Sequence, residues 1–197
     1  MKCMYAARMA RFDLLRPVQG LARYLTKWTR RNDKELFQLI CYIQSTKSNK
    51  LVGWVADPLH LLHGVLFSDA DFAGCERTMK STTGVYTCLL GPNTHFPLSG
   101  QSKRQGCISQ STTEAELVVA CHALKSSGIP LQSILDQLNT AMGSECPLFY
   151  HFVDNQAMIE GVRTGRNPTM RHLGRVHGVS IGFLHEQYRD NLSLIHI

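Results

Sequence analysis

The stretch "FSDADFAGC" (Phe67–Cys75) sets two aspartates, Asp69 and Asp71, one residue apart, directly after the apolar residues "GVLF" (64–67). A short apolar run that ends in polar and turn-forming residues indicates a buried β-strand. An aspartate at the end of a strand is more often a turn former than a catalyst. Taken alone, the two aspartates therefore leave open whether either carboxylate does chemistry.

The residues around this stretch predict a sheet with helices before and after it. "HGVLFSDA", "TTGVYTCLLG" and the weaker "HFPLSGQSKR" predict a three-stranded antiparallel meander from Gly64 to Arg104. Apolar residues at helical spacing, and an S-x-x-E capping box formed by Ser111 and Glu114, predict helices. We expect helices over 13–28, 33–45 (capped by Asn32 or Asp33), 111–125 (interrupted by Gly128 and Pro130), 131–138, 155–162 and 172–190, and short strands over 51–55 and 147–153.

The composition predicts a globular protein that works inside the cell. The chain has 197 residues, of which 44% are hydrophobic and 18% charged. No apolar run reaches the roughly 20 residues that a membrane span needs, and we expect neither membrane binding nor secretion. The seven cysteines are scattered without a C-x-x-C pair, which is typical of a reducing compartment, the cytoplasm or nucleus. The net charge of +6 fits a polyanionic partner or simply a mildly basic protein.

Three acidic residues stand where a site is expected. Asp69 ends the first strand, Glu116 lies in the first turns of the long helix, and Asp154 ends a later strand. Strand ends and helix starts collect along one edge of an α/β sheet. Convergent carboxylates repel one another unless a cation neutralises them, and hard oxygen ligands favour Mg²⁺ or Mn²⁺. Helical periodicity does not choose between Glu114 and Glu116, because each lies under about 100° from the centre of the apolar stripe, on opposite sides of it.

Several motifs, in order, resemble one known family. The chain offers "SDADFAGC", "KSTTG", "SKRQ", "STTEAEL" and "VDNQAMI". These are similar to S-D-A-D-W-A-G, R-S-T-S-G, S-K-K-Q, S-S-T-E-A-E-Y and C-D-N-Q-S-A-I of the ribonuclease H (RNase H) domain of copia-type retrotransposon Pol polyproteins. The resemblance covers roughly residues 60–188. The upstream stretch "ARFDLLRPVQGLARYL" resembles the segment that joins reverse transcriptase to RNase H in the same polyproteins.

The resemblance implies a fold, a reaction and a set of site residues. It implies an RNase H-like α/β fold, a five-stranded mixed sheet flanked by helices, here with an N-terminal helical segment. It also implies cleavage of the RNA strand of RNA–DNA hybrids with two Mg²⁺ (or Mn²⁺) ions. Carried over by motif, Asp69, Glu116 and Asp154 are the catalytic, metal-binding carboxylates. Asp71 and Glu114 belong to the motifs but are expected to hydrogen-bond nearby backbone instead.

The chain departs from the family pattern at the fourth acid. The family's "K-H-I-D-I-R-Y-H-F-I-R-E" helix matches "RVHGVSIGFLHE", which puts Gly178 where the aspartate should be. Glu186 is eight residues further, about 12 Å along a helix, and cannot simply replace it. His172, His177 or Ser180 are candidate weaker ligands or proton carriers. With three of four expected carboxylates, we expect an impaired nuclease.

The sequence therefore predicts a division into segments and two alternative functions. Residues 1–58 would be a helical remnant of the reverse transcriptase/connection region, 59–190 the RNase H-like domain, and 191–197 a tail of uncertain origin. The first function is RNA–DNA hybrid cleavage; the alternative is a non-catalytic module that binds nucleic acid or packs on a polymerase. The expected partners are an RNA–DNA hybrid and the reverse transcriptase portion of the polyprotein. The residues suited to phosphate contact are Arg77, Lys80, Lys103, Arg104, Arg163, Arg166 and Arg171.

Overall fold

The computed structural model describes residues 2–75, 77–144, 148–190 and 193–196. Its centre is a mixed sheet with the strand order β3-β2-β1-β4-β5. The first three strands form the expected antiparallel meander, whereas β4 runs parallel to β1 and β5 runs parallel to β4. The mixed α/β sheet expected for an RNase H-like fold is thereby confirmed. The strands are β1 (His63–Cys75), β2 (Lys80–Gly91), β3 (Thr94–Arg104), β4 (Tyr150–Val153) and β5 (Ser193–His196).

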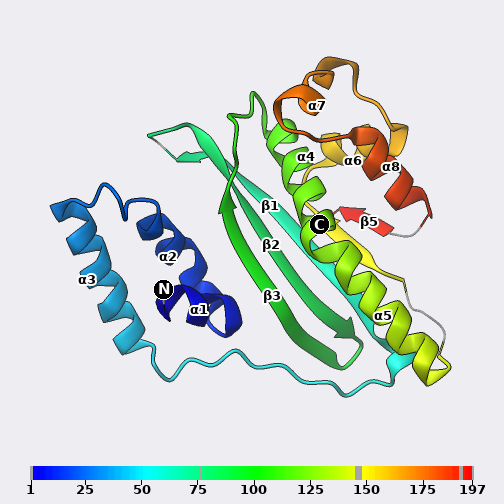
Figure 1. Ribbon diagram of the computed structural model, residues 1–197. Helices are drawn as coiled ribbons and strands as arrows, with labels where there is room; N and C mark the ends of the chain where they lie inside the picture. Colours follow the sequence, from blue (N-terminus) through cyan, green and yellow to red (C-terminus); the bar gives the residue numbers. More distant parts are fainter. Residues whose placement is uncertain (1, 76, 145–147, 191–192, 197) are drawn as a thin grey trace.

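The helices lie in two groups around this sheet (Figure 1). The N-terminal helices α1 and α2 lie beside β3, and α4 and α5 run across the sheet. The N-terminal helical segment is thus also confirmed. The α-helices are α1 (Lys2–Met9), α2 (Leu15–Ala22), α3 (Arg30–Ser45), α4 (Thr112–Ala123), α5 (Ile129–Met142), α6 (Gln156–Thr164), α7 (Leu173–Val176) and α8 (Ile181–Asp190). Within the described ranges, no helix is long and apolar enough to cross a membrane.

Five local predictions were wrong, each for an identifiable reason. The helix expected over 13–28 is shorter, because α2 ends at Ala22 and a turn follows. Thr29, not Asn32 or Asp33, caps α3, since the Asn32 side chain folds back to accept the Thr29 backbone N–H at 3.0 Å. The expected strand 51–55 is reduced to one isolated bridge between Trp54 and His95.

The fourth error concerns the long helix, which Gly128 and Pro130 do not interrupt. A π-helical turn (Leu124–Gly128) joins α4 to α5. Pro130 falls in the first turn of α5, where its missing N–H costs little. A Cβ at position 128 would come within 3.2 Å of the Leu66 side chain, so glycine there lets the helix approach β1 closely.

The last helix predicted, 172–190, is divided into α7 and α8. Gly178 stands between them with φ of +66°, a left-handed conformation that ends a helix. Leu173, before Gly178, and Val179 and Leu184, after it, are all buried in the core. The break therefore turns the chain so that both sides of Gly178 pack on the domain.

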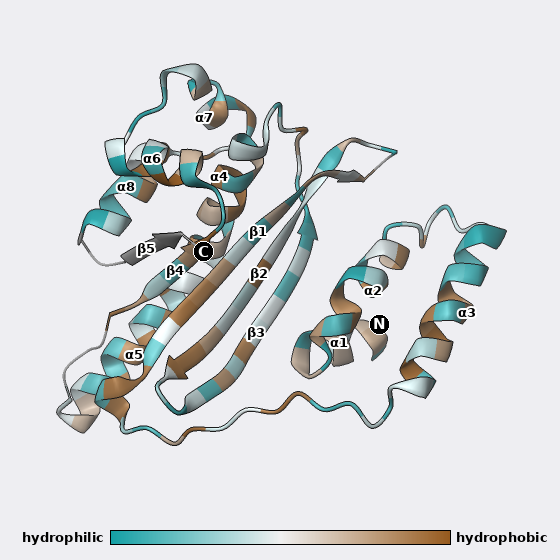
Figure 2. Cartoon of the chain, turned by 180° about the vertical axis from the view of Figure 1, so that it is seen from behind, coloured by the Kyte–Doolittle hydropathy of each residue, from teal (hydrophilic) through white to brown (hydrophobic). Residues whose placement is uncertain are grey.

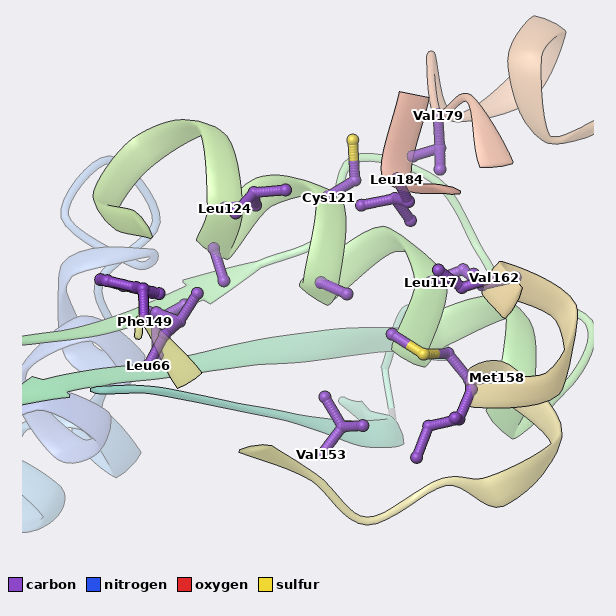
Figure 3. Packing of buried hydrophobic residues seen from close by; sticks show 14 of the residues in the cluster. Leu66, Leu117, Cys121, Leu124, Phe149, Val153, Met158, Val162, Val179 and Leu184 are labelled. Atoms are coloured by element: carbon purple, nitrogen blue, oxygen red, sulfur yellow. The ribbon is translucent and has the colours of Figure 1, made fainter. Parts of the chain in front are cut away.

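Two separate hydrophobic clusters hold the elements together. The larger lies between the sheet and helices α4, α5, α6 and α8, and includes Leu66, Leu117 and Leu124, each fully buried (Figure 3). Figure 2 shows hydrophobic residues gathered along β1 and β2. The smaller cluster belongs to the N-terminal helices and contains Leu14, Val18 and Leu39 among others. Burial of each such side chain stabilises the fold by about 1.5–3 kcal/mol.

Candidate metal centre

Three elements bring Asp69, Glu116 and Asp154 together. Asp69 lies in β1, Asp154 directly follows β4, and Glu116 lies in the second turn of α4. Phe67 of β1 is in register with Phe152 of β4, so two residues further along these parallel strands Asp69 stands beside Asp154. One carboxylate oxygen of each acid lies within 4.8 Å of the others. The three predicted site acids thus form one cluster where the parallel pairing of β1 with β4 ends.

Glu116 is the buried member of the cluster and has an unfilled oxygen. Its residue exposure is 5%. Oε1 accepts the backbone N–H of Ala70 at 3.1 Å, whereas Oε2 is buried without a hydrogen-bond partner in the described part of the chain. Burial, together with the charges of Asp69 and Asp154, raises the pKa of Glu116 to about 7. Burial and the Asp154 charge also raise the pKa of Asp69.

This arrangement fits a hard divalent cation. Carboxylates whose pKa values are raised by burial and by one another are stabilised in their charged form when a cation binds between them. The donors are all carboxylate oxygens, the ligands that Mg²⁺ and Mn²⁺ prefer. The orphaned Oε2 of Glu116 would gain the partner that it lacks. The triad could therefore bind a metal.

Glu114, two residues earlier on α4, has the opposite environment. It is 2% exposed, and Oε2 accepts the backbone N–H of Gln110 at 3.0 Å. Oε1 lies 2.7 Å from Nε2 of His177, and Oε2 lies 3.3 Å from Nε2 of His172. Burial alone would raise the pKa of Glu114, but the backbone bond and the two histidines outweigh it and lower the pKa. Its expected hydrogen bond to backbone is confirmed, and the histidines are additional partners.

The residues around the missing fourth acid do not join the triad. His172 and His177 were candidate replacement ligands, and this prediction was wrong, because their ring nitrogens are directed at Glu114. Ser180 Oγ accepts the N–H of Phe183 at 3.1 Å and so supports the start of α8. Among the residues that the structure describes, Asp69, Glu116 and Asp154 are the only group of three or more acidic, histidine or cysteine side chains that could hold a metal.

Asp71 plays a structural part that differs from the expected one. Instead of a bond to backbone, its Oδ2 accepts from Nη2 of Arg16 at 2.5 Å. This ion pair is half-exposed and joins the end of β1 to α2. Asp71 therefore helps to hold the N-terminal helices on the sheet, and it does not belong to the group of possible metal ligands.

The seven basic residues come from three segments of the chain. Arg77, after β1, lies over the Tyr24 ring at 5.4 Å, and the ammonium of Lys80 donates to the carbonyl of Gly106. Lys103 and Arg104 end β3 and line a cavity next to α4. Arg163 lies 3.5 Å from Glu160 on α6. Arg166 and Arg171 are exposed in the loop that follows α6.

Sequence reasoning missed a buried polar network beside the triad. Ser68 Oγ lies 2.8 Å from Nε2 of His151, and Nδ1 of His151 bonds the hydroxyl of Tyr188. Burial lowers the pKa of His151 to about 3, so the imidazole is neutral. The network connects β1, β4 and α8, and its member Ser68 directly precedes Asp69. A histidine inside the otherwise apolar and aromatic strand "FYHFV" was the signal that could have revealed it.

Comparison with known proteins shows what the chain is similar to. No protein-family model matches. The chain is 30% identical, over 157 residues, to the Retrovirus-related Pol polyprotein from transposon TNT 1-94 of Nicotiana tabacum. The chain is homologous to a region of a copia-type Pol polyprotein. The matched region is 80% of this chain but 11% of that Pol polyprotein, so the chain spans about a tenth of its relative's length.

Other proteins are similar to parts of this chain. An uncharacterized mitochondrial protein of Arabidopsis thaliana is 48% identical over 50 residues, 25% of this chain and 19% of that protein. LC11-RNase H1, isolated from compost by a metagenomic approach, has a TM-score of 0.42 at 16% identity, covering 68% of this chain and 84% of that one. The prototype foamy virus protease-reverse transcriptase has a TM-score of 0.31 at 13% identity, covering 94% of this chain and 21% of that one. Neither structural likeness is close enough to bear on this chain.

Proposed function

We propose that residues 59–190 are an RNase H domain that cleaves the RNA strand of an RNA–DNA hybrid. The observation that carries the proposal is the approach of Asp69, Glu116 and Asp154 to within 4.8 Å. The homology to a Pol polyprotein supports it, because the relative belongs to a transposon. Residues 1–58 would then be the helical remnant of the reverse transcriptase/connection region. Of the tail 191–197, whose origin the sequence leaves open, Ser193–His196 form β5 at the edge of the domain's sheet.

The chain's own groups prepare the site for Mg²⁺ or Mn²⁺. Asp69, Glu116 and Asp154 would hold one or two ions, which when bound supply an activated water and stabilise the leaving oxygen of a phosphodiester. The Ala70 N–H fixes Oε1 of Glu116, so that Oε2 is left for a ligand role. The parallel register of β1 and β4 sets Asp69 against Asp154. These backbone constraints hold three repelling carboxylates in place before any cation binds.

The missing fourth carboxylate predicts a slow enzyme. Gly178 occupies the position that the family pattern gives to an aspartate, and the neighbouring histidines are engaged by Glu114. Three carboxylates provide fewer ligands and less negative charge than four, which weakens metal binding and raises the barrier. Cleavage would therefore be slower than is normal for the family.

The substrate and partners follow from the same proposal. Arg77, Lys80, Lys103, Arg104, Arg163, Arg166 and Arg171 would contact phosphates, a salt-dependent and largely sequence-independent mode of binding. The hybrid would be recognised through its backbone, its minor groove and its 2′-hydroxyls. The reverse transcriptase portion of the polyprotein would be the protein partner, and the reaction would take place in the cytoplasm or nucleus.

A cleavage assay tests the proposal directly. The full chain is incubated with an end-labelled RNA–DNA hybrid and Mg²⁺ or Mn²⁺, beside Asp69→Asn and the control Asp71→Asn. We expect slow RNA cleavage that Asp69→Asn abolishes and Asp71→Asn retains. Equal cleavage by the wild type and Asp69→Asn would rule out the triad as the catalyst. A rate normal for the family would instead contradict the impairment.

A non-catalytic nucleic-acid-binding module is the second candidate. The observation in its favour is that His172 and His177 face Glu114, which leaves the triad without a fourth ligand in the described part of the chain. Salt-sensitive hybrid binding that is unaffected by EDTA and by Asp154→Asn would support this module. Tight Mn²⁺ binding that is lost in Asp154→Asn would support the nuclease.

A further inference from the structure

A second site lies next to α4, in a cavity of about 350 Å³. Its walls come from the end of β3, from α4 and the π-helical turn that follows, and from the loop around Gly178. Its volume is within the range of small-ligand sites. The cationic and imidazole side chains among its lining residues are those of Lys103, Arg104, His122, Lys125 and His177.

The cavity lies on the side of α4 away from the metal triad. At about 100° per residue, Val118, Cys121 and His122 stand about 120–160° around the helix from Glu116. In Figure 3, Cys121 points toward Val179 and Leu184, and Val153, which precedes Asp154, lies across α4 from them. The cavity is therefore distinct from the acidic cluster.

The walls are basic and have no acidic counterpart. No aspartate or glutamate is among the residues that line the cavity within the described chain. Neither Lys103 nor Lys125 has an ion pair with any residue that the structure describes, although the Lys125 ammonium lies 4.8 Å over the Phe183 ring. Glu114 compensates His177 from behind, but it does not line the cavity. Two lysines thus line one cavity whose walls contain no carboxylate.

His122 adds an unused donor or acceptor to the same walls. Its Nε2 is buried without a hydrogen-bond partner among the described residues. Burial and the charge of Lys103 lower the pKa of His122, so the ring is held neutral by its surroundings. A buried polar atom without a partner is costly unless a ligand or water completes it. An anion in the cavity would relieve the repulsion between the cations that line it.

From these observations we propose that this cavity binds the oxyanion of a phosphate group, held by Lys103 and Lys125 with His122 beside it. The two sources of such a group are a phosphodiester of a bound nucleic-acid strand and free inorganic phosphate. Phosphate oxygens are strong acceptors for ammonium groups, and such charge-assisted bonds are the strong class of hydrogen bond. The site does not depend on the proposed nuclease activity, because no residue of the triad takes part.

The full chain is titrated with inorganic phosphate and the heat of binding is measured by calorimetry. EDTA is present so that no divalent ion bridges the protein and the phosphate. The double variant Lys103→Gln/Lys125→Gln removes both ammonium groups. Its matched control, Lys47→Gln/Lys50→Gln, removes the same charge from the exposed turn after α3. We expect saturable binding that weakens at least tenfold in the first variant, since a hydrogen bond to a charged group contributes enough for roughly a tenfold change.

The controls separate this site from the nuclease. The control pair and Asp154→Asn should bind phosphate within about twofold of the wild type. The absence of saturable binding in the wild type, or an equal loss in the two lysine pairs, would overturn the proposal whatever the outcome of the cleavage assay. A short oligonucleotide added as competitor identifies the source: displacement of phosphate assigns the site to a nucleic-acid strand, and lack of displacement assigns it to free phosphate.

Discussion

Two glutamates on one helix have nearly equal burial and opposite roles. Glu114 and Glu116 are 2% and 5% exposed and lie two residues apart on α4. The Gln110 N–H and His177 hydrogen-bond Glu114, Nε2 of His172 lies 3.3 Å from it, and the pKa of Glu114 is lowered. Glu116 receives one bond from Ala70 and faces two further carboxylates, and its pKa is raised to about 7.

The contrast shows that burial of an acid does not by itself indicate a reactive site. Glu114 is satisfied within the fold, so it works as a connector between α4 and the segment around α7. Glu116 is left with an oxygen that no described group satisfies. A buried carboxylate is therefore a ligand candidate when one of its oxygens lacks a hydrogen-bond partner and other carboxylates lie close to it.

The largest expected difference concerns metal binding. Glu116→Gln removes one charge from the triad and should weaken Mn²⁺ binding at least a hundredfold, because a buried carboxylate ligand loses its charge. Glu114→Gln makes the same change two residues away and should leave Mn²⁺ affinity within a few-fold. Titration with Mn²⁺, followed by electron paramagnetic resonance, measures both. Equal losses in the two variants would contradict the assignment of Glu116 as the ligand.

The free energy of unfolding should fall more on substitution of Glu114 than on substitution of Glu116. Glu114→Ala leaves the Gln110 N–H and the buried His177 ring without their acceptor, at a cost of about 3 kcal/mol in the free energy of unfolding. Glu116→Gln in metal-free protein at pH 8 should be neutral or stabilising, because it removes a repelling charge. Urea unfolding in EDTA compares the two. If Glu116→Gln were the more destabilised variant, the assignment of the structural role to Glu114 would be wrong.

The sequence already predicts much of this site. The order of strands, the position of Asp69 and Asp154 after apolar runs, and the helix start at Ser111 follow from local patterns. Periodicity alone could not choose between the two glutamates, since both flank the same apolar stripe. The family motif selects Glu116, and the structure agrees that Glu116, not Glu114, lies with the aspartates.

What the sequence could not supply depends on contacts between distant segments. His172 and His177 are more than fifty residues from Glu114, and nothing local indicates that they meet it. The pairing of Asp71 with Arg16 is equally distant in sequence. The π-helical turn after α4 was not predicted, because Gly128 and Pro130 usually end a helix. Here tight packing of Gly128 against Leu66 favours continuation of the helix.

The free energy of unfolding should depend on pH because of Glu116. Its folded pKa of about 7 lies above the usual value of 4.5, so the folded state binds the proton more tightly than the unfolded state. The stability from this group is fully present below pH 4.5 and is lost as the pH rises through 7. The loss is at most about 3 kcal/mol, at about 1.4 kcal/mol per pKa unit.

Urea unfolding of metal-free protein between pH 4.5 and 8 measures this loss, and Glu116→Gln is the control. The decline should be clearly smaller in the variant, with a remainder from Asp69, whose pKa is raised in the same direction. Saturating Mn²⁺ should reverse the decline in the wild type, because the ion stabilises the charged carboxylates. A wild type and variant with the same slope would show that Glu116 is not the group that titrates.

The smallest expected effect tests whether the missing acid can be restored. Gly178→Asp puts back the carboxylate of the family pattern, yet Gly178 lines the basic cavity together with His122 and Lys125. We expect Mn²⁺ affinity to stay within about twofold of the wild type, at a stability cost of about 1 kcal/mol from the left-handed φ of +66°. Gly178→Asn carries the same backbone cost without the charge and is the matched control. If Gly178→Asp bound Mn²⁺ tenfold more tightly than Gly178→Asn, the loop would reach the triad, and the two faces of α4 would not be independent.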